Sequence, residues 1–404
     1  MKILALGGCG EMGGYAVRTL LKNDSPPEII IADKNAETAE NFAKNLGNMV
    51  RWMSLDISDQ HALSRAVGES DLVMNTVGPY FKFGKSVLTA CIQAQKHYVD
   101  ICDDWEPTLE MLALHPEAEK AGITAIVGMG ASPGISNMLA VKAMGELDHA
   151  RKIYTGWDLD SAKPEKTGKK PSAATVHGVH QLTGTIRAFE NGEYIYKKPI
   201  RRLTMDYPGI GPGTVWTIGH PEAVTLPRYF QDLTLSSNVM TTSPGNIFGL
   251  KIVAMLVDGG IISVDRAAWV AEKVGGPANP QDTPEKMLSE MVAVKRKGLP
   301  PLFALAVGEK DGKLASAACM ITSAPAGGMG GATGVPLAVA AMLLGKGAVL
   351  AKGVFAPEAA ISPEVFFNTL GPLCAPARNG AQDLVLTTRS WELVQVRNLL
   401  RKFF

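Results

Sequence analysis

The sequence predicts an α/β protein built from a doubly wound parallel sheet and a second α+β domain with a largely antiparallel or mixed sheet. Strand-length apolar runs alternate with polar, alanine-rich segments through the first third of the chain. A Gly-x-Gly-x-x-Gly pattern follows the first of these runs. After residue 130 the strand-like segments lie closer together, and Gly, Pro and Asn separate them, as is typical of antiparallel pairing.

Six apolar runs are predicted to be the parallel strands, because continuous apolar strands alternating with helices indicate a sheet covered on both faces. They are Ile3–Leu6, Ile29–Ala32, Val50–Leu55, Leu72–Thr76, Tyr98–Ile101 and Thr124–Val127. Helices are expected between them at Met12–Lys22, Ala36–Leu46 and His61–Val67. This order is that of a Rossmann domain.

The middle of the chain predicts a different sheet. We expect strands at Lys152–Asp158, Pro199–Asp206, Thr214–Ile218 and Leu233–Met240, and a hairpin of Phe303–Val307 with Leu314–Ile321 closed at Lys310-Asp311-Gly312. Helices are expected at Phe248–Val257, Val264–Val274 and Pro284–Lys297, and a solvated loop at Lys163–Lys170. This domain is expected to span residues 131–334.

The C-terminal part returns to helix. Leu337–Leu344 is apolar and alanine-rich, and Pro336 suits a first helical position. We expect this helix to pack on the first domain, so that residues 1–130 are completed by helices from about 335–404.

Composition excludes several classes of function. The formal net charge of the 404 residues is +1, which gives no field to attract nucleic acid or an anionic membrane. We expect no membrane-spanning segment, which would need about 18 apolar residues, and interpret the N-terminal apolar run as a buried strand. The five cysteines have no Cys-x-x-Cys spacing, so we expect free buried thiols, no metal and a cytoplasmic protein.

The pattern Gly8-x-Gly10-x-x-Gly13 predicts a dinucleotide site. Gly8 permits the tight turn, Gly10 lets the backbone approach a pyrophosphate, and Gly13 lets helix and strand pack closely. The helix that follows presents free N–H groups and a partial positive charge to the phosphates, so Glu11 and Met12 are included in the site.

Asp33 ends the second strand, where a carboxylate can accept both ribose hydroxyls and repel a 2′-phosphate. Lys34 follows and could pair with such a phosphate, so NAD is expected and NADP is possible. Asp56 suits a position beside the adenine. The spacing Gly7-x-x-Gly10-x-x-Gly13 also fits short-chain dehydrogenases, but their Tyr-x-x-x-Lys pair matches only Tyr194 and Lys198, in a β-like stretch, and we reject that class.

Four motifs in order resemble the saccharopine dehydrogenase family. They are the glycine turn, Asn75-Thr76-Val77-Gly78-Pro79-Tyr80, His97-Tyr98-Val99-Asp100 and Gly128 to Asn137. A weaker similarity to the family's closing segment is found at Gly353-Val354-x-x-Pro357-Glu358. The resemblance implies a Rossmann domain, a substrate domain that often mediates dimers, and NAD(P)-linked hydride transfer at an amine or imine carbon. Thr76, Gly78 and Pro79 would then contact the cofactor.

One departure from the family bears on the substrate. Saccharopine reductases read Asp-Pro-Gly-Ile-Asp-His where this chain has Ser132-Pro133-Gly134-Ile135-Ser136-Asn137. Both acids and the histidine are missing, which argues against saccharopine itself. The loop is closer to the lysine 6-dehydrogenase-like branch, where uncharged residues stand here.

Candidate catalytic side chains follow the strand ends, where open α/β sheets bind ligands. Tyr80 is either a catalytic side chain or a core or lid aromatic. Asp103 is our candidate base beyond the fifth strand; Asp100 and Asp104 lie beside it in sequence, and a solvated loop is the alternative for Asp103 and Asp104. Ser132 either caps a helix or binds a substrate carboxylate, and Asn137 is a second candidate for substrate binding.

The segment from Gly219 to Arg228 is the candidate site in the second domain. His220 could transfer a proton near neutral pH and Arg228 could clamp a carboxylate; the alternative is a surface β-turn with ordinary charges. His177 and His180 are interpreted as loop histidines.

Three functions remain open. The first is an NAD(P)-dependent dehydrogenase or reductase acting on CH–NH or CH–NH2 groups of an amino acid or imine, such as a lysine derivative. The second is a polyamine-linked reductase of the carboxynorspermidine type. The third is a dinucleotide-sensing regulator without turnover. We expect a homodimer.

Overall fold

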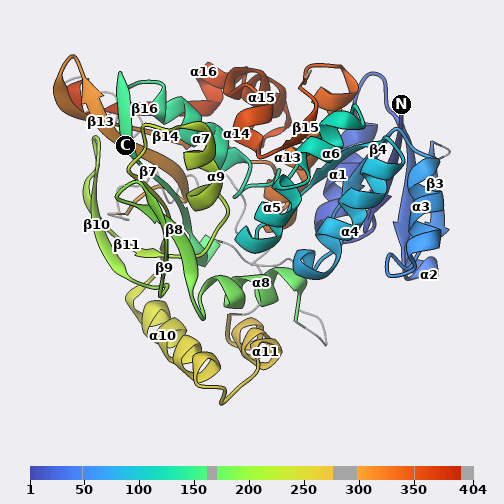
Figure 1. Ribbon diagram of the computed structural model, residues 1–404, viewed down its shortest axis with the longest axis horizontal. Helices are drawn as coiled ribbons and strands as arrows, with labels where there is room; N and C mark the ends of the chain where they lie inside the picture. The colour runs from blue at the N-terminus through green and yellow to red at the C-terminus, as the bar shows by residue number, and fades with distance from the viewer. Residues whose placement is uncertain (48, 162–170, 276–297, 350, 393–404) are drawn as a thin grey trace. The chain divides into compact units, whose positions relative to one another are not determined.

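The computed structural model describes residues 1–47, 49–161, 171–275, 298–349 and 351–392. The chain divides into two compact units (Figure 1). Unit 1 comprises Met1–Ile135 and Met329–Ser362, and unit 2 comprises Ser136–Gly328 and Pro363–Phe404. We expected the first domain to be completed by residues 335–404. The contacts instead group residues from Pro363 onward with unit 2.

Unit 1 contains a seven-stranded sheet with the order β15-β6-β5-β4-β1-β2-β3, in which every pair of neighbours is parallel. Its strands are β1 (Lys2–Leu6), β2 (Glu28–Asp33), β3 (Val50–Ser54), β4 (Leu72–Asn75), β5 (His97–Asp100), β6 (Thr124–Ile126) and β15 (Gly353–Phe355). The six predicted strands are confirmed within one or two residues at each end. The order reverses between β1 and β4, the point at which doubly wound sheets form a ligand crevice.

Helices connect these strands. They are α1 (Glu11–Leu21), α2 (Ala36–Lys44), α3 (Gln60–Gly68), α4 (Tyr80–Gln93), α5 (Trp105–Leu112) and α6 (His115–Lys120). The C-terminal part adds α13 (Gly328–Gly345) and α14 (Pro357–Ala360). The inner strands are buried along most of their length, as expected for a sheet covered on both faces, whereas the edge strand β3 is exposed over most of its length.

Helix α13 corrects two expectations. It begins at Gly328, so Pro336 lies inside the helix and not at its first position. It is also an uncharged helix of 18 residues with a mean hydropathy of 1.5, long and apolar enough by length and composition to cross a membrane, although we expected no such segment. In the structure 72% of it is buried. Gly334 faces α1, because a Cβ atom there would lie 2.2 Å from the Met12 carbonyl oxygen.

Unit 2 is built on a nine-stranded mixed sheet with the path β10-β11-β12-β7-β13-β14-β16, to which β8 and β9 attach beside β12. The strands are β7 (His149–Asp158), β8 (Ile186–Glu190), β9 (Glu193–Lys197), β10 (Arg202–Tyr207), β11 (Gly211–Thr217), β12 (Leu235–Thr241), β13 (Leu302–Lys310), β14 (Lys313–Ile321) and β16 (Val385–Arg389). Only the pair β7 and β12 is parallel among the described pairs, which confirms the mixed sheet.

Helices of unit 2 are α7 (Ile135–Met144), α8 (Ala173–Gln181), α9 (Glu222–Tyr229), α10 (Pro244–Asp258), α11 (Val264–Gly275), α15 (Pro363–Leu370) and α16 (Ala381–Leu384). The predicted hairpin is β13–β14. Tyr194 and Lys198 lie in and just after β9, so the β-like assignment of that stretch is confirmed. The predicted helix at Pro284–Lys297 and the loop at Lys163–Lys170 lie outside the described residues.

One hydrophobic cluster of unit 2 is centred on Tyr207 and Phe303, which meet edge to face with ring centroids 5.7 Å apart. Gly156 allows this packing, because a Cβ atom there would lie 2.2 Å from the Phe303 ring. The five cysteines are free, and four of them are buried, as the sequence predicts.

Candidate functional site

The glycine turn joins β1 to α1 and has the backbone geometry that a pyrophosphate site needs. Gly7 has a φ of +69°, a conformation that side chains rarely adopt, so the sharpest bend falls one residue before the predicted Gly8. A Cβ atom on Gly13 would lie 2.3 Å from the Gly7 carbonyl oxygen, and one on Gly8 would lie 2.8 Å from the Ala5 Cβ. Glycine is therefore required at these positions for close packing of the turn.

Helix α1 begins at Glu11, with Gly10 at its N-cap. Gly10 is exposed and Glu11 and Met12 are half-buried. The first turn of a helix has N–H groups without intrahelical acceptors and a partial positive charge. A glycine at the N-cap leaves these groups accessible, so the residues present fit a bound pyrophosphate.

Thr76 supports the turn from the end of β4. Its hydroxyl donates to the carbonyl oxygens of Leu6 and Gly7, at 2.9 and 3.1 Å. Thr76 was predicted to contact the cofactor. The structure shows that its hydroxyl holds the turn that would bind the cofactor.

Asp33 ends β2 beside this turn. Its carboxylate accepts hydrogen bonds from the Asn35 backbone N–H at 2.9 Å and from the Cys9 thiol at 3.2 Å. Burial, followed by the Asp33 contact, raises the pKa of Cys9 to about 12, so the thiol stays protonated and can donate. The turn and the carboxylate are thus linked directly.

Lys34 and Asp56 form an ion pair at 2.8 Å between an exposed lysine and a half-buried aspartate. The hydrogen bond from Lys34 holds the pKa of Asp56 below its usual range, and the same bond raises the pKa of Lys34. Exposed pairs of this kind contribute little to stability. Lys34 would have to leave Asp56 to reach a 2′-phosphate.

The segment Thr76–Pro79 is half-buried at the carboxyl end of β4, and Tyr80 begins α4. Tyr80 is buried, and its hydroxyl donates to the Asn75 carbonyl oxygen at 2.9 Å. Burial, with Asp100 nearby, raises the pKa of Tyr80 well above its ordinary value. A phenol so disposed is a weak proton donor, which favours the core-aromatic interpretation.

Asp100 accepts several hydrogen bonds in a buried network that was not predicted from the sequence. It accepts hydrogen bonds from the Tyr98 hydroxyl at 2.7 Å, the Gly128 N–H at 2.7 Å and the Cys102 N–H at 3.0 Å. Asn75 in turn donates to the Tyr98 hydroxyl. Burial raises the pKa of Asp100 to about 6, against the opposing effect of these hydrogen bonds. The network ties together the carboxyl ends of β4, β5 and β6.

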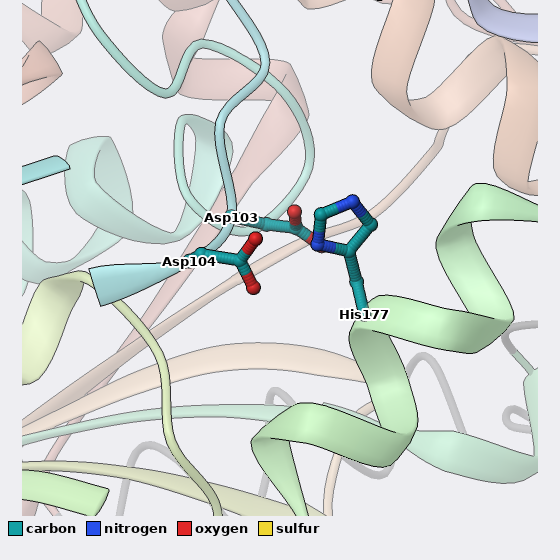
Figure 2. Close-up of side chains that lie close together, drawn as sticks. All are labelled: Asp103, Asp104 and His177. Carbon is teal, nitrogen blue, oxygen red and sulfur yellow. The ribbon is translucent and has the colours of Figure 1, made fainter. Parts of the chain in front are cut away.

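Asp103 and Asp104 lie in the segment between β5 and α5, and His177 lies on α8 (Figure 2). Asp103 is half-buried and Asp104 is buried at the N-cap of α5, so neither belongs to a freely solvated loop. His177 and His180 are helical, so their interpretation as loop histidines was wrong. The sequence signal for the start of this helix was Ser172, which is its N-cap and whose hydroxyl accepts a hydrogen bond from the Thr175 N–H.

The loop before α7 is closely packed. Gly134 has a φ of +120°, and a Cβ atom there would lie 2.1 Å from the Gly130 carbonyl oxygen. Ser132 is half-buried and lies three residues before the first residue of α7. Asn137, our second candidate for substrate binding, is fully buried in the first turn of α7.

Unit 2 contains a buried polar cluster around Glu222, the first residue of α9. We call Glu222, His220, Ser136, Asn238 and Thr155 the Glu222 cluster. One Glu222 oxygen, Oε1, accepts from the Ser136 hydroxyl at 2.5 Å. The other, Oε2, accepts from Asn238 Nδ2 at 3.0 Å and lies 2.9 Å from His220 Nδ1.

Both titratable members of this cluster are buried, since Glu222 is 0% and His220 is 2% exposed. The alternative of a surface β-turn at residues 219–228 was therefore wrong. Arg228, in contrast, is exposed in the last turn of α9. Its predicted role as a carboxylate clamp stays a prediction, as do the functional roles of Ser132 and Asn137.

Comparisons with known proteins agree with this geometry. The family model of the saccharopine dehydrogenase NADP-binding domain matches residues 3–126. The saccharopine dehydrogenase (NADP+, L-glutamate-forming) of Saccharomyces cerevisiae is 30% identical over 149 residues, 37% of this chain and 32% of the yeast protein. This chain thus aligns with about a third of the length of that relative.

Two relatives align along most of the chain. The carboxyaminopropylagmatine dehydrogenase of a Synechocystis species is 22% identical over 91% of this chain and 95% of its own length. The carboxynorspermidine synthase of Vibrio cholerae is 23% identical over 92% of this chain and 94% of its own length.

A solved structure of the yeast saccharopine dehydrogenase covers 96% of this chain and 99% of its own, with a TM-score of 0.61 and 17% identity, which shows a shared fold. The Rossmann sheet, the glycine turn and the match to residues 3–126 together identify a nicotinamide dinucleotide-binding domain. Residues 3–126 are thus similar to the NADP-binding domain of saccharopine dehydrogenase, and the chain shares its fold with the yeast enzyme.

Proposed function

We propose that this protein is an NAD-dependent oxidoreductase that acts at the C–N centre of an amino acid or a related carboxylated amine. The observation that carries the proposal is the glycine turn with Asp33 beside it at the reversal point of the sheet. A bound nicotinamide ring would supply hydride transfer. The protein would orient the substrate carbon, exclude water and handle the proton on nitrogen.

The choice between NAD and NADP depends on Asp33. The family model and the yeast relative are both named for NADP, which favours the phosphorylated cofactor. Against this, the Asp33 carboxylate is held at the end of β2 by Asn35 and Cys9, where it suits ribose hydroxyls and opposes a 2′-phosphate. Lys34 is engaged by Asp56. We therefore propose NAD, on the geometry of this chain.

The substrate class rests on the full-length relatives. Their names denote carboxylated polyamines, and each aligns with more than nine-tenths of this chain. The sequence of the saccharopine enzyme aligns with 37% of this chain, and the loop at 132–137 lacks the charged residues of saccharopine reductases. These observations favour the second candidate, a polyamine-linked dehydrogenase or reductase, over action on saccharopine itself.

The test is steady-state absorbance at the NADH band. Wild-type protein is assayed with NAD and NADP against amino acids and carboxylated polyamines, and in reverse with NADH or NADPH against the corresponding imines. The proposal expects turnover with at least one carboxylated amine or its imine. Saturable NADH binding without turnover on any member would favour the dinucleotide-sensing regulator. Faster turnover with NADP than with NAD would overturn the assignment of Asp33.

A further inference from the structure

We infer that Cys9 is a positioning residue that sets the preference between NAD and NADP, because its thiol holds the Asp33 carboxylate in the orientation that accepts ribose hydroxyls and opposes a 2′-phosphate. This inference rests on the proposed function and deepens it, since it names a residue that determines cofactor specificity. Cys9 and Asp33 both belong to unit 1.

The backbone that carries Cys9 is fixed against the end of β2. Cys9 lies in the turn from β1 to α1, which is closed by the Gly10 N–H donating to the Gly7 carbonyl oxygen at 2.9 Å. The Gly7 N–H donates in turn to the Ala32 carbonyl oxygen, also at 2.9 Å. The turn is therefore joined to β2 at the residue directly before Asp33.

The Asp33 side chain is held by donors from both sides. Its backbone carbonyl oxygen accepts from the Leu55 N–H at 2.9 Å, which fixes the end of the strand. In the carboxylate, Oδ1 accepts from the Asn35 N–H at 2.9 Å and Oδ2 accepts from the Cys9 thiol at 3.2 Å. A carboxylate offers about four acceptor sites, so about two remain for ribose hydroxyls.

The Cys9 thiol is available as a donor at physiological pH. Burial, followed by the contact with Asp33, raises the pKa of Cys9 to about 12, so the sulfur keeps its hydrogen. Free cysteines usually behave as small buried hydrophobes, and the other four cysteines of this chain are buried. Cys9 departs from that pattern both in its exposure and in its carboxylate partner.

A carboxylate held in one orientation affects the two cofactors in opposite ways. The ribose of NAD meets an acceptor that needs no further ordering, and such preorganisation strengthens binding. The 2′-phosphate of NADP meets a negative charge that cannot turn away, and opposed like charges discriminate against a ligand. Without the thiol, Asp33 retains one of its two donors and is less restrained. Loss of the thiol is therefore expected to weaken NADH binding and to favour NADPH binding.

The first experiment measures the hydrogen bond without any cofactor. The S–H stretching band of a thiol in the infrared moves to lower frequency when the thiol donates to a strong acceptor. The Cys9 band is assigned by difference against Cys9→Ser, both in the wild type and in Asp33→Ala. We expect the band to lie at lower frequency in the wild type. A Cys9 band at the same frequency in both proteins would overturn the inference, whether or not the protein binds a dinucleotide.

The second experiment measures the Kd of NADH and of NADPH by isothermal titration, and compares the ratio of the two between variants. Cys9→Ala should shift this ratio toward NADPH about fivefold, as expected for the loss of one hydrogen bond. Cys9→Ser keeps a donor at this position and should keep the ratio within about twofold. In an Asp33→Ala background, Cys9→Ala should also change the ratio less than about twofold, because its effect depends on Asp33.

Cys319→Ala is the matched control. Cys319 is a buried residue of unit 2, and its sulfur lies 3.3 Å from the Thr387 hydroxyl oxygen. This variant should keep the ratio within about twofold of the wild type. A wild-type ratio in Cys9→Ala would refute the positioning role, and so would the same shift with and without Asp33. Equal weakening of both cofactors in Cys9→Ala would also refute it, since Cys9 would then only support the turn.

The proposed function and this inference fail on different observations. Dinucleotide binding without turnover would count against the proposed function alone, because both experiments are carried out without substrate. A wild type that prefers NADPH would overturn the choice of NAD, while the shift in Cys9→Ala still decides the role of Cys9. A wild type that binds neither dinucleotide would overturn the inference.

Discussion

Replacing Gly334 by Ala tests whether α13 holds the cofactor-binding end of α1 in place. The added Cβ would lie 2.2 Å from the Met12 carbonyl oxygen, 2.9 Å from the Tyr15 Cβ and 3.1 Å from the Ala16 nitrogen. Ordinary van der Waals contact begins near 3.4 Å, and two of these neighbours are backbone atoms of α1. The two helices must therefore separate by roughly 1 Å, which is the overpacking that destabilises cores.

The expected magnitude follows from two opposing effects. Overpacking costs about 1–3 kcal/mol, whereas Ala in place of Gly in a helix stabilises by about 0.5–1 kcal/mol. We expect a net loss of about 1–2 kcal/mol in the free energy of unfolding. Because the displaced turn carries the N–H groups at Met12 and Gly13, the Kd for the dinucleotide should rise about tenfold, the equivalent of about 1.4 kcal/mol.

The assay is isothermal titration of NADH into each protein, with unfolding midpoints measured in parallel. Gly249→Ala is the matched control, since Gly249 lies inside α10 and nothing lies within 4 Å of the Cβ it would gain. This control should be slightly stabilised and should bind NADH as wild type does. If Gly334→Ala also bound and unfolded like wild type, the proposed support of α1 by α13 would be wrong.

Three further substitutions test the roles of Asp33, Thr76 and Asp100. Asp33→Ala should raise the Kd for NADH about tenfold by removing a charged acceptor, and leave or lower that for NADPH; equal changes would refute the ribose assignment. Thr76→Val should cost about 1 kcal/mol and weaken NADH binding a few-fold, because the turn loses the hydroxyl that donates to Gly7; unchanged binding would contradict this. Burial raises the pKa of Asp100 to about 6 in the folded protein, above its value of about 4 in the unfolded chain. Protonated Asp100 therefore stabilises the folded state. This contribution is fully present below about pH 4 and is lost as the pH rises through 6. Asp100→Asn should remove about 3 kcal/mol of this pH dependence, measured by denaturant unfolding between pH 4 and 7; a variant with the wild-type slope would show that Asp100 is not its source.

The parallel sheet could be predicted from the sequence because its signals are local. Buried parallel strands are continuous apolar runs, and the glycine turn has a fixed spacing after the first of them. The motif at Gly353–Glu358 was noticed as a family echo, but its place as β15 beside β6 was not predicted. That pairing joins residues more than 200 positions apart, and three residues carry no periodicity to predict it.

The bounds of helices were predicted less well near proline and glycine residues, which suggested helix starts or turns that the structure does not have. Pro336 looked like a helix start, yet α13 runs through it, because the glycines before it pack closely against α1. The prolines near His220 suggested a turn, but Pro221 is the N-cap of a helix and Pro227 lies inside that helix.

The members of the Glu222 cluster could not be grouped from any local sequence pattern. His220 and Glu222 were noticed as an unusual pair, but Ser136 and Asn238 come from α7 and β12 and meet them only in the folded unit. Asn238 also looked like an ordinary strand residue. Its role depends on a backbone N–H of α9, which the sequence cannot place beside it.

The central claim is that the glycine turn binds a nicotinamide dinucleotide with Asp33 on the ribose. Equilibrium titration of NADH and NADPH into wild type and Gly13→Val tests it most directly, since a side chain at 13 would meet the Gly7 carbonyl oxygen at 2.3 Å. We expect saturable binding of one NADH per chain, tighter than that of NADPH, and its loss in a Gly13→Val protein that remains folded. Absence of NADH and NADPH binding to the wild type, or undiminished binding to Gly13→Val, would contradict it.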